Sequence, residues 1–267
     1  MSQPFYRLRR QTEFPGEART GFFSRFSGVA ALLVLWEIAA HLGWISRWLA
    51  VPPSRLPAEI YRLAQSGELQ LHLGATLHRV GVAFAIGGSA GALFGLAAGR
   101  FALLRTPAQP LLGALTATPK LALLPLAIAV LGMGESSRNF PAILACFTLM
   151  AMHCMDAVQR VQPAYVELAR GYGASGFKLF RYAYLPPCLP QIFTGLRLSL
   201  AMSLVMVVAA EMIGATSGIG VMIWLAGQSL AMPRLYAGLI VCAALGFTLT
   251  SALYWLERRC LPWASAR

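Results

Sequence analysis

The residues whose types and spacing could do specific chemistry are concentrated in the stretch 167–190, ELARGYGASGFKLFRYAYLPPCLP. It separates two long apolar runs and carries charges, glycines and prolines: Glu167, Arg170, Lys178, Arg181, Gly171, Gly173, Gly176, Pro186, Pro187 and Pro190. Such a segment cannot lie in hydrocarbon, where backbone groups and charges find no water. We therefore expect a loop on one face of a membrane.

The spacing within this loop predicts two short helices joined by a glycine elbow. The run PAYVELAR opens with Pro163, a residue favoured at the first helical position. Gly171 and Gly173 should break this helix, and the second segment, SGFKLFRYAY, should end at Leu185-Pro186. Its apolar side chains exceed what a loop needs for itself, which favours a docking surface over an ordinary basic loop: Phe177, Leu179, Phe180, Tyr182 and Tyr184.

Catalytic patterns are missing from the sequence. It contains no GxxxxGK[ST] phosphate loop, no GxSxG and no HExxH. His153 and Asp156 stand three residues apart, as in half of a metal site, but no second pair completes it. We therefore expect no catalytic residue, no metal and no cofactor bound by this chain.

Composition identifies an integral membrane protein. The chain of 267 residues is 57% hydrophobic and only 12% charged, whereas soluble domains carry about 25% charged residues. The formal net charge of +12 could suggest nucleic acid. The basic residues flank apolar segments, however, which is the topology signal of a membrane protein, so we expect no nucleic-acid partner.

Apolar runs long enough to cross a bilayer predict an all-α protein with six transmembrane helices. The third span is interrupted at Pro119-Lys120, so it should be kinked or broken. The second is rich in glycine, which favours close helix contact. Between the last two spans, an apolar, glycine-rich segment should form a short helix rather than a further span. The six expected spans are 27–49, 79–99, 110–131, 140–157, 191–212 and 235–256.

Basic residues predict the orientation. With a cytoplasmic amino terminus, most arginines and lysines fall in inside segments, which is the expected bias, and the loop at about 160–190 is then cytoplasmic. We expect a cytoplasmic tail at 1–26, a single transmembrane domain at 27–267 and both termini in the cytoplasm. Arg79, Lys120 and Arg197 lie too close to span boundaries to be assigned. The inside set is Arg7, Arg9, Arg10, Arg19, Arg25, Arg100, Arg105, Arg160, Arg170, Lys178, Arg181, Arg258, Arg259 and Arg267; the outside set is Arg47, Arg55, Arg62, Arg138 and Arg234.

The loop resembles the signature loop of the permeases of binding-protein-dependent ABC importers. The similarity rests on Glu167-x-Ala169, then Gly173, then Leu185-Pro186. Departures are Leu168 in the middle of the Glu-Ala-Ala triplet and Ala183, where a larger aliphatic residue is usual. Segments from about 49 to the end are similar to the nitrate/sulfonate/taurine branch, including LAVPPSRLPAEIYRL, ATPKLALLPLAIAVLGMGESSR, AEMIGATSGIGVMIWLA and LERRCLPW.

This resemblance implies a fold, partners and site residues. The fold is a core of five helices plus one amino-terminal helix, in the bacterial inner membrane. Two copies of the permease would work with two cytoplasmic ATPase subunits, which bind ATP and Mg²⁺, and with an external solute-binding protein. The loop would be the coupling helix that enters a groove of the ATPase, through Glu167, Leu168, Ala169, Gly173, Ala174, Ser175, Phe177, Leu185 and Pro186.

Candidates for the solute route are fewer and weaker. A route on the axis of two subunits would be lined by the third and fifth spans, although methionine and leucine in a span more often serve packing. Glu211 is an intramembrane acid, which suggests function, yet it also suits a structural cap. The candidates are Pro119, Leu121, Leu123, Met202, Ser203, Met206 and Glu211.

Two alternatives stay open. A gradient-driven secondary transporter would often show an internal repeat and intramembrane acids for ion coupling; the sequence shows no repeat and few such acids. A membrane scaffold or enzyme would need a site, and none is visible. The sequence leaves the solute open among sulfonates, taurine, nitrate, bicarbonate and aromatic acids.

Overall fold

The computed structural model describes residues 22–43 and 51–262. The chain divides into two units, Met1–Ser54 and Arg55–Arg267, which are considered separately. The first unit contains α1, Phe22–His41. Near the end of α1, Glu37 lies 3.0 Å from His41 Nε2 and accepts hydrogen bonds from the backbone N–H and hydroxyl of Ser54, at 3.1 and 2.8 Å. The expected tail at 1–26 lies almost wholly outside the described residues.

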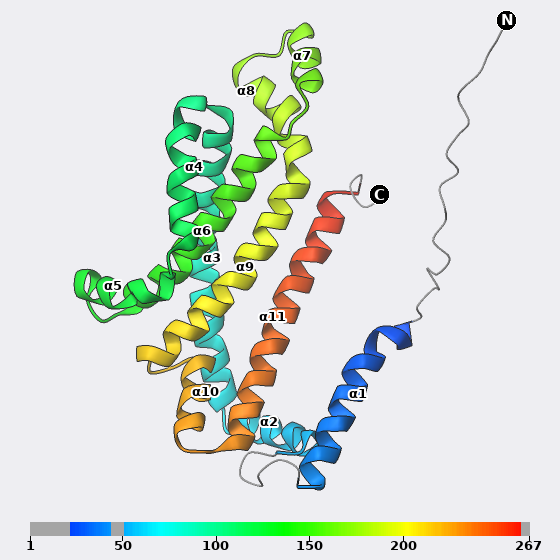
Figure 1. The fold of residues 1–267 in the computed structure, drawn as a ribbon, viewed down its shortest axis with the longest axis vertical. Helices are drawn as coiled ribbons and strands as arrows, with labels where there is room; N and C mark the ends of the chain where they lie inside the picture. Colours follow the sequence, from blue (N-terminus) through cyan, green and yellow to red (C-terminus); the bar gives the residue numbers. More distant parts are fainter. Residues whose placement is uncertain (1–21, 44–50, 263–267) are drawn as a thin grey trace, which may run out of the picture. The chain divides into compact units, whose positions relative to one another are not determined.

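The second unit is built from helices packed around α3, α6 and α9 (Figure 1). Four long helices, α3, α6, α9 and α11, run alongside one another, with α7 and α8 at one end and α2 and α10 at the other. The bounds are α2 Leu56–Gln65, α3 Glu68–Arg100, α4 Ala102–Ala117, α5 Leu124–Leu131, α6 Glu135–Gln159, α7 Pro163–Gly171, α8 Gly176–Leu179, α9 Leu185–Gly214, α10 Ile219–Gln228 and α11 Met232–Cys260.

Four helical stretches in the described residues are long and apolar enough to cross a membrane: Glu68–Arg100, Glu135–Gln159, Gly176–Gly214 and Met232–Cys260. The pair Ala102–Ala117 and Lys120–Leu131 would make a fifth if it forms one broken span. Ala30–His41 and Ile219–Gln228 are shorter apolar helices. The all-α membrane class is thereby confirmed, whereas the count of six spans stays a prediction.

The expected interruption of the third span is a sharp bend. The helical axis turns by 90° between α4 and the segment Lys120–Leu131. Thr118 and Pro119 are extended at the bend, and Pro119 cannot donate a backbone hydrogen bond. The Lys120 ammonium donates to the Leu115 carbonyl oxygen at 2.7 Å, so this side chain satisfies one of the free carbonyls at the end of α4.

A glycine ridge brings α3 against α6. Gly87, Gly91 and Gly95 recur every fourth residue, and a Cβ on any of them would come within 3 Å of α6 atoms. Such a ridge lets two backbones approach closely, which is a main source of helix association in membranes. A Cβ added at Gly88 would come no closer than 3.8 Å to a side-chain atom, and one at Gly81 would have nothing within 4 Å, so these two glycines of the second span are not in tight contact.

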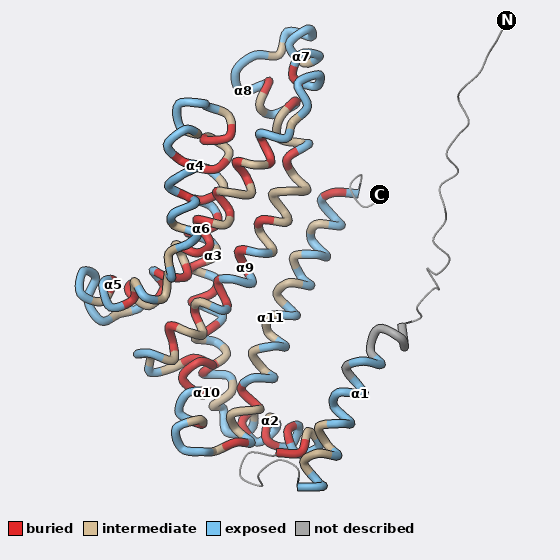
Figure 2. The backbone as a smooth tube through the Cα atoms, viewed as in Figure 1, coloured by how far each residue is buried: buried red, intermediate tan, exposed pale blue. Residues whose placement is uncertain are grey.

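Buried residues concentrate where α3, α6 and α9 meet, and α11 is exposed along most of its length (Figure 2). One apolar cluster joins these three helices; its buried members are Val80, Ala83, Ala142, Leu200, Leu204 and Val207. A second cluster joins α3, α4 and α6 through Ala98, Ala108, Leu112, Ala151 and Met155. The exposed faces of the long helices are apolar, as lipid contact requires.

The helix that contains the expected fifth span begins earlier than the sequence predicts. We expected Leu185-Pro186 to end the second loop helix, but this is wrong, because helical structure continues from Gly176 to Gly214. A π-turn at Phe180–Tyr184 precedes the prolines, and the Leu185 N–H bonds back to the Phe180 carbonyl. Pro186 and Pro187, which have no N–H to donate, follow the π-turn directly in the first turn of α9.

Candidate functional site

The loop between α6 and α9 folds as a knob, defined here as residues 163–184. It consists of α7, α8 and the π-turn. Gly173 has a φ of +80° and ends α7, while the Ala174 N–H bonds to the Ala169 carbonyl at 3.0 Å and the Gly173 N–H to the Arg170 carbonyl at 2.8 Å. This is a Schellman motif, in which a left-handed residue lets the chain turn sharply. The glycine elbow is therefore present.

The knob has a small core of its own. Val166 of α7, Leu179 of α8 and Ala183 of the π-turn are buried together. Ala169 and Ala174, the two residues joined by the Schellman bond, pack against them. This apolar contact across the turn accompanies many Schellman motifs. The shared core fixes the position of α7 relative to α8. It also stabilises both helices, because isolated helices this short are only marginally stable in water.

The outer surface of the knob is aromatic and basic. Tyr172, Phe177 and Tyr182 are 86%, 78% and 71% exposed. Leu168 is also exposed, and so are the cations Arg170, Lys178 and Arg181. Exposed aromatic side chains gathered beside cations are typical of protein interaction sites. The knob thus exposes an aromatic and basic surface of the kind found at protein interfaces.

The other residues that we expected at a coupling interface lie at different depths. Glu167 is exposed on α7 and lines a cleft of about 320 Å³ beside the ends of α3 and α6. Ser175 precedes α8 in an extended conformation and is exposed. Leu185 and Pro186 are half-buried at the start of α9, beyond the π-turn and outside the knob.

The route candidates come from two segments of the chain, the bend after α4 and the helix α9. Pro119, Leu121 and Leu123 lie at the bend after α4, where Pro119 is exposed and the two leucines are half-buried. On α9, Ser203 is fully buried and its hydroxyl donates to the Leu200 carbonyl of its own helix at 2.7 Å. Met202 is 36% exposed, whereas Met206 packs against the core of α3, α6 and α9.

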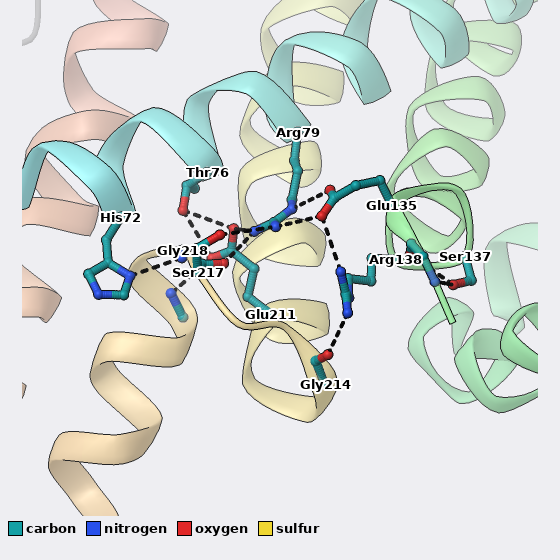
Figure 3. A network of polar contacts seen from close by, with 12 residues as sticks. His72, Thr76, Arg79, Glu135, Ser137, Arg138, Glu211, Gly214, Ser217 and Gly218 are labelled. Carbon is teal, nitrogen blue, oxygen red and sulfur yellow. Dashed lines mark hydrogen bonds and ion pairs between the residues drawn. The ribbon is translucent and has the colours of Figure 1, made fainter. Parts of the chain in front are cut away.

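Glu211 is the buried end of a charge cluster that reaches the surface, at the opposite end of the unit from the knob (Figure 3). Its carboxylate accepts a hydrogen bond from Arg79 Nη1 at 2.8 Å and lies 2.9–3.0 Å from the Thr76 hydroxyl. Glu211 and Arg79 are only 1% and 4% exposed. Arg79 also binds both carboxylate oxygens of Glu135, at 2.7 and 2.8 Å, and Arg138 binds Glu135 at 3.1 Å. Two arginines and two glutamates leave no net charge.

The same cluster caps the amino terminus of α10. The N–H groups of Gly218, Ile219 and Gly220 donate to His72 Nδ1, the Thr76 hydroxyl and the Glu211 carboxylate, at 3.0, 2.8 and 2.9 Å. A carboxylate at a helix amino terminus also interacts favourably with the helix dipole. Side chains from α3 and α9 thus accept hydrogen bonds from the N–H groups at the start of α10. Together with Arg79 and Thr76, the Gly220 N–H gives both carboxylate oxygens of Glu211 a protein partner.

Sequence reasoning left Arg79 unassigned at a span boundary and missed its partners and neighbours in the cluster, which are His72, Thr76, Glu135 and Arg138. The available signal was their charge and polarity beside apolar runs, because ionisable groups in membrane segments pair with one another. Arg197, also unassigned, pairs with Glu257 and so ties α9 to α11. Pairings across 60 or 132 positions of sequence cannot be read without the fold.

Comparison with known proteins agrees with these features. Residues 91–261 match the family model described as the inner membrane component of binding-protein-dependent transport systems. The taurine transport system permease protein of Escherichia coli (strain K12) is 34% identical over 240 residues, covering 88% of this chain and 87% of that protein. The putative aliphatic sulfonates transport permease protein of Bacillus subtilis (strain 168) is 29% identical over 252 residues, covering 94% and 91%. The nitrate import permease protein of Synechocystis sp. is 28% identical over 249 residues, covering 88% and 87%.

The chain therefore belongs to the family of inner membrane permease components of binding-protein-dependent ABC importers. Within that family it falls in the branch that contains the taurine, sulfonate and nitrate permeases. It is a multi-pass protein of the inner membrane.

Proposed function

We propose that this chain is the permease subunit of an ATP-driven importer of a small anionic solute, coupled to a cytoplasmic ATPase through residues 167–186. Two copies form the route, two ATP-binding subunits bind ATP and Mg²⁺, and an external binding protein delivers the solute. The permease itself binds no nucleotide. Both of its termini lie in the cytoplasm.

The knob is the observation that carries this proposal. Its own core and its Schellman turn make it rigid enough to transmit a displacement, and its exposed tyrosines and Phe177 offer an apolar surface to a partner. The second helix of the knob runs without interruption into α9. Movement of the knob therefore moves the inner end of a membrane span directly.

The coupling step follows from this connection. When ATP draws two ATPase subunits together, the paired knobs are pulled with them, and α9 rocks between inward-open and outward-open arrangements. Glu167 and Leu168 contact the ATPase from α7, and Ala174, Ser175 and Phe177 contact it from the elbow and α8. Ala169 and Gly173 hold the elbow, and Leu185 and Pro186 join it to the span.

The solute class is proposed from the relatives, whose names specify taurine, aliphatic sulfonates and nitrate. These are small anions. The route is proposed to pass the bend at Pro119, Leu121 and Leu123 and the α9 residues Met202, Ser203 and Met206. Glu211 is proposed to hold the mouth of the route together through Arg79 rather than to bind the solute, because its carboxylate oxygens already have partners.

Phe177→Ala tests the docking surface, with Phe247→Ala as the matched control. Both rings are highly exposed, at 78% and 74%, but Phe247 lies on α11 away from the knob. Removing an aromatic anchor costs about 2 kcal/mol or more of binding free energy, or roughly 30-fold in affinity. We expect co-purification with the ATPase and ATP-dependent uptake to fall for Phe177→Ala only.

Gly173→Ala tests the elbow, with Gly171→Ala as its control. Gly173 has a positive φ, Gly171 does not, and neither has an atom within 4 Å of its Cβ position. A left-handed alanine costs about 1–2 kcal/mol, so coupling should weaken for Gly173→Ala alone.

Undiminished ATPase binding and uptake in both test variants, Phe177→Ala and Gly173→Ala, would reject the docking assignment. Uptake that follows an ion gradient in vesicles without ATP would favour a secondary transporter instead.

A further inference from the structure

The cleft beside α7 lies where two membrane helices end. Its walls include Arg100, the last residue of α3, and Gln159, the last residue of α6. The volume of about 320 Å³ is at the lower end of the range of small-molecule sites, about 300–1,000 Å³. The cleft is therefore a cavity at the level where the chain leaves the hydrocarbon.

The charge of this cleft is positive and locally uncompensated. Arg100, Arg105 and Arg170 line it together with one acid, Glu167, so the formal charge of the lining is +2. No carboxylate of the described residues lies within 4 Å of these three guanidinium groups. Arg100 is instead placed over the rings of Tyr184 and Phe101, at 5.2 and 5.6 Å. Stacking on aromatic faces restrains a guanidinium while its N–H groups can still bind an anion.

Apolar surface adjoins the charge. Val158, Val161 and Val166 contribute to the lining of the cleft. At the start of α4, Phe101 and Leu103 are 56% and 88% exposed. A ligand that fits both features carries a phosphate next to hydrocarbon, because arginine binds phosphate oxygens in a fork and basic pockets between membrane helices hold anionic lipid headgroups.

We propose that this cleft binds the phosphate of an anionic phospholipid, with Arg100 and Arg105 as the principal ligands and the acyl chains along the first turn of α4. A lipid is favoured over an acidic side chain of a protein partner because the apolar surface of Leu103 has no role in binding a carboxylate. The lipid would support the base of the knob, since Arg170 and Glu167 of α7 line the same cleft. The proposal requires only that the chain lies in a membrane and does not depend on transport.

Native mass spectrometry of the full chain in detergent tests this site, with phosphatidylglycerol and phosphatidylcholine of identical acyl chains as probes. Each arginine near a lipid phosphate contributes about 1 kcal/mol, or about fivefold in affinity. The double variant Arg100→Gln/Arg105→Gln should bind phosphatidylglycerol about 30-fold more weakly than the unmodified chain. Arg105→Gln alone should lose about fivefold and Arg105→Lys should lose little, which keeps the test decisive if the double variant folds poorly.

The matched control is Arg258→Gln/Arg259→Gln. These arginines also stack on aromatic rings, those of Tyr254 and Trp255, near the end of a membrane helix, but they do not line the cleft. The control should retain phosphatidylglycerol binding. Equal binding of the two lipids, equal loss in control and test variants, or competition by soluble glycerol 3-phosphate at the lipid's own affinity would overturn the proposal. Displacement of the lipid by the ATPase subunit would also overturn it, because the cleft would then be a protein contact.

Discussion

Glu211 illustrates how a single acidic residue can serve structure within an apolar bundle. Its carboxylate holds Arg79 and Thr76 of α3 and the first turn of α10 at once. A buried ion pair need not stabilise a protein relative to apolar residues, but removing one member leaves the other charge uncompensated. The pair therefore specifies how α3, α9 and α10 meet. Gly218 contributes, because any Cβ at this position would collide with the Glu211 carboxylate.

Glu211→Gln should destabilise the protein by about 1–3 kcal/mol, less than the cost of leaving a buried charge with no partner, because Arg79 keeps its ion pair with Glu135. Arg79 would keep Glu135 and the Ser217 carbonyl as partners but lose the charge beside it. Thermal unfolding in detergent measures the effect. Glu167→Gln makes the same chemical change at an exposed position and should leave unfolding unaltered. If the two variants unfold alike, the charge cluster does not hold these helices.

At the scale of elements, the contact between α3 and α6 depends on the absence of side chains. A Cβ at Gly95 would lie 2.8 Å from the Ala151 Cα and the Cys154 Cβ, and those atoms belong to a neighbouring helix that cannot yield without moving. A Cβ at Gly81 of the same helix would meet open space. Alanine at Gly95 therefore tests the packing of α3 on α6, whereas alanine at Gly81 tests only the helix propensity of α3.

Gly95→Ala should cost about 1–3 kcal/mol through overpacking. Gly81→Ala should be neutral or stabilise the chain by about 0.5–1 kcal/mol, because alanine is the better helix former. The yield of folded protein and its midpoint of thermal unfolding report both effects. A variant at Gly95 as stable as one at Gly81 would mean that α3 and α6 do not approach as closely as described.

Sequence reasoning predicted these elements where a local property determines them. The length of apolar runs indicated the long apolar helices, Pro119 located the bend, and Gly173 located the elbow. It failed at Leu185-Pro186, because the π-turn that admits the prolines into α9 depends on re-paired backbone bonds rather than on residue type. It also did not predict that the helix holding the second span starts as early as Glu68 and includes the polar His72 and Thr76, whose partners lie far along the chain.

At the scale of the whole molecule, the second unit has two chemically different ends. One end carries the knob and the turn between α3 and α4 with Arg100; the other carries α2, α10 and the neutral cluster around Arg79 and Glu211 (Figures 1 and 3). A basic end facing the cytoplasm is the common arrangement in inner membranes. The charge pattern of the sequence predicts this asymmetry, but which helices meet at each end required the fold.

Photocrosslinking from the tip of the knob tests the coupling proposal most directly. The photoreactive residue benzoylphenylalanine would replace Phe177 in the intact transporter, with Phe247→benzoylphenylalanine as the control on α11. The account predicts a crosslink from position 177 to the ATP-binding subunit, changed in yield when ATP is added, and none from position 247. A crosslink from position 177 to the external binding protein, or none to the ATP-binding subunit in an assembled and active transporter, would contradict it.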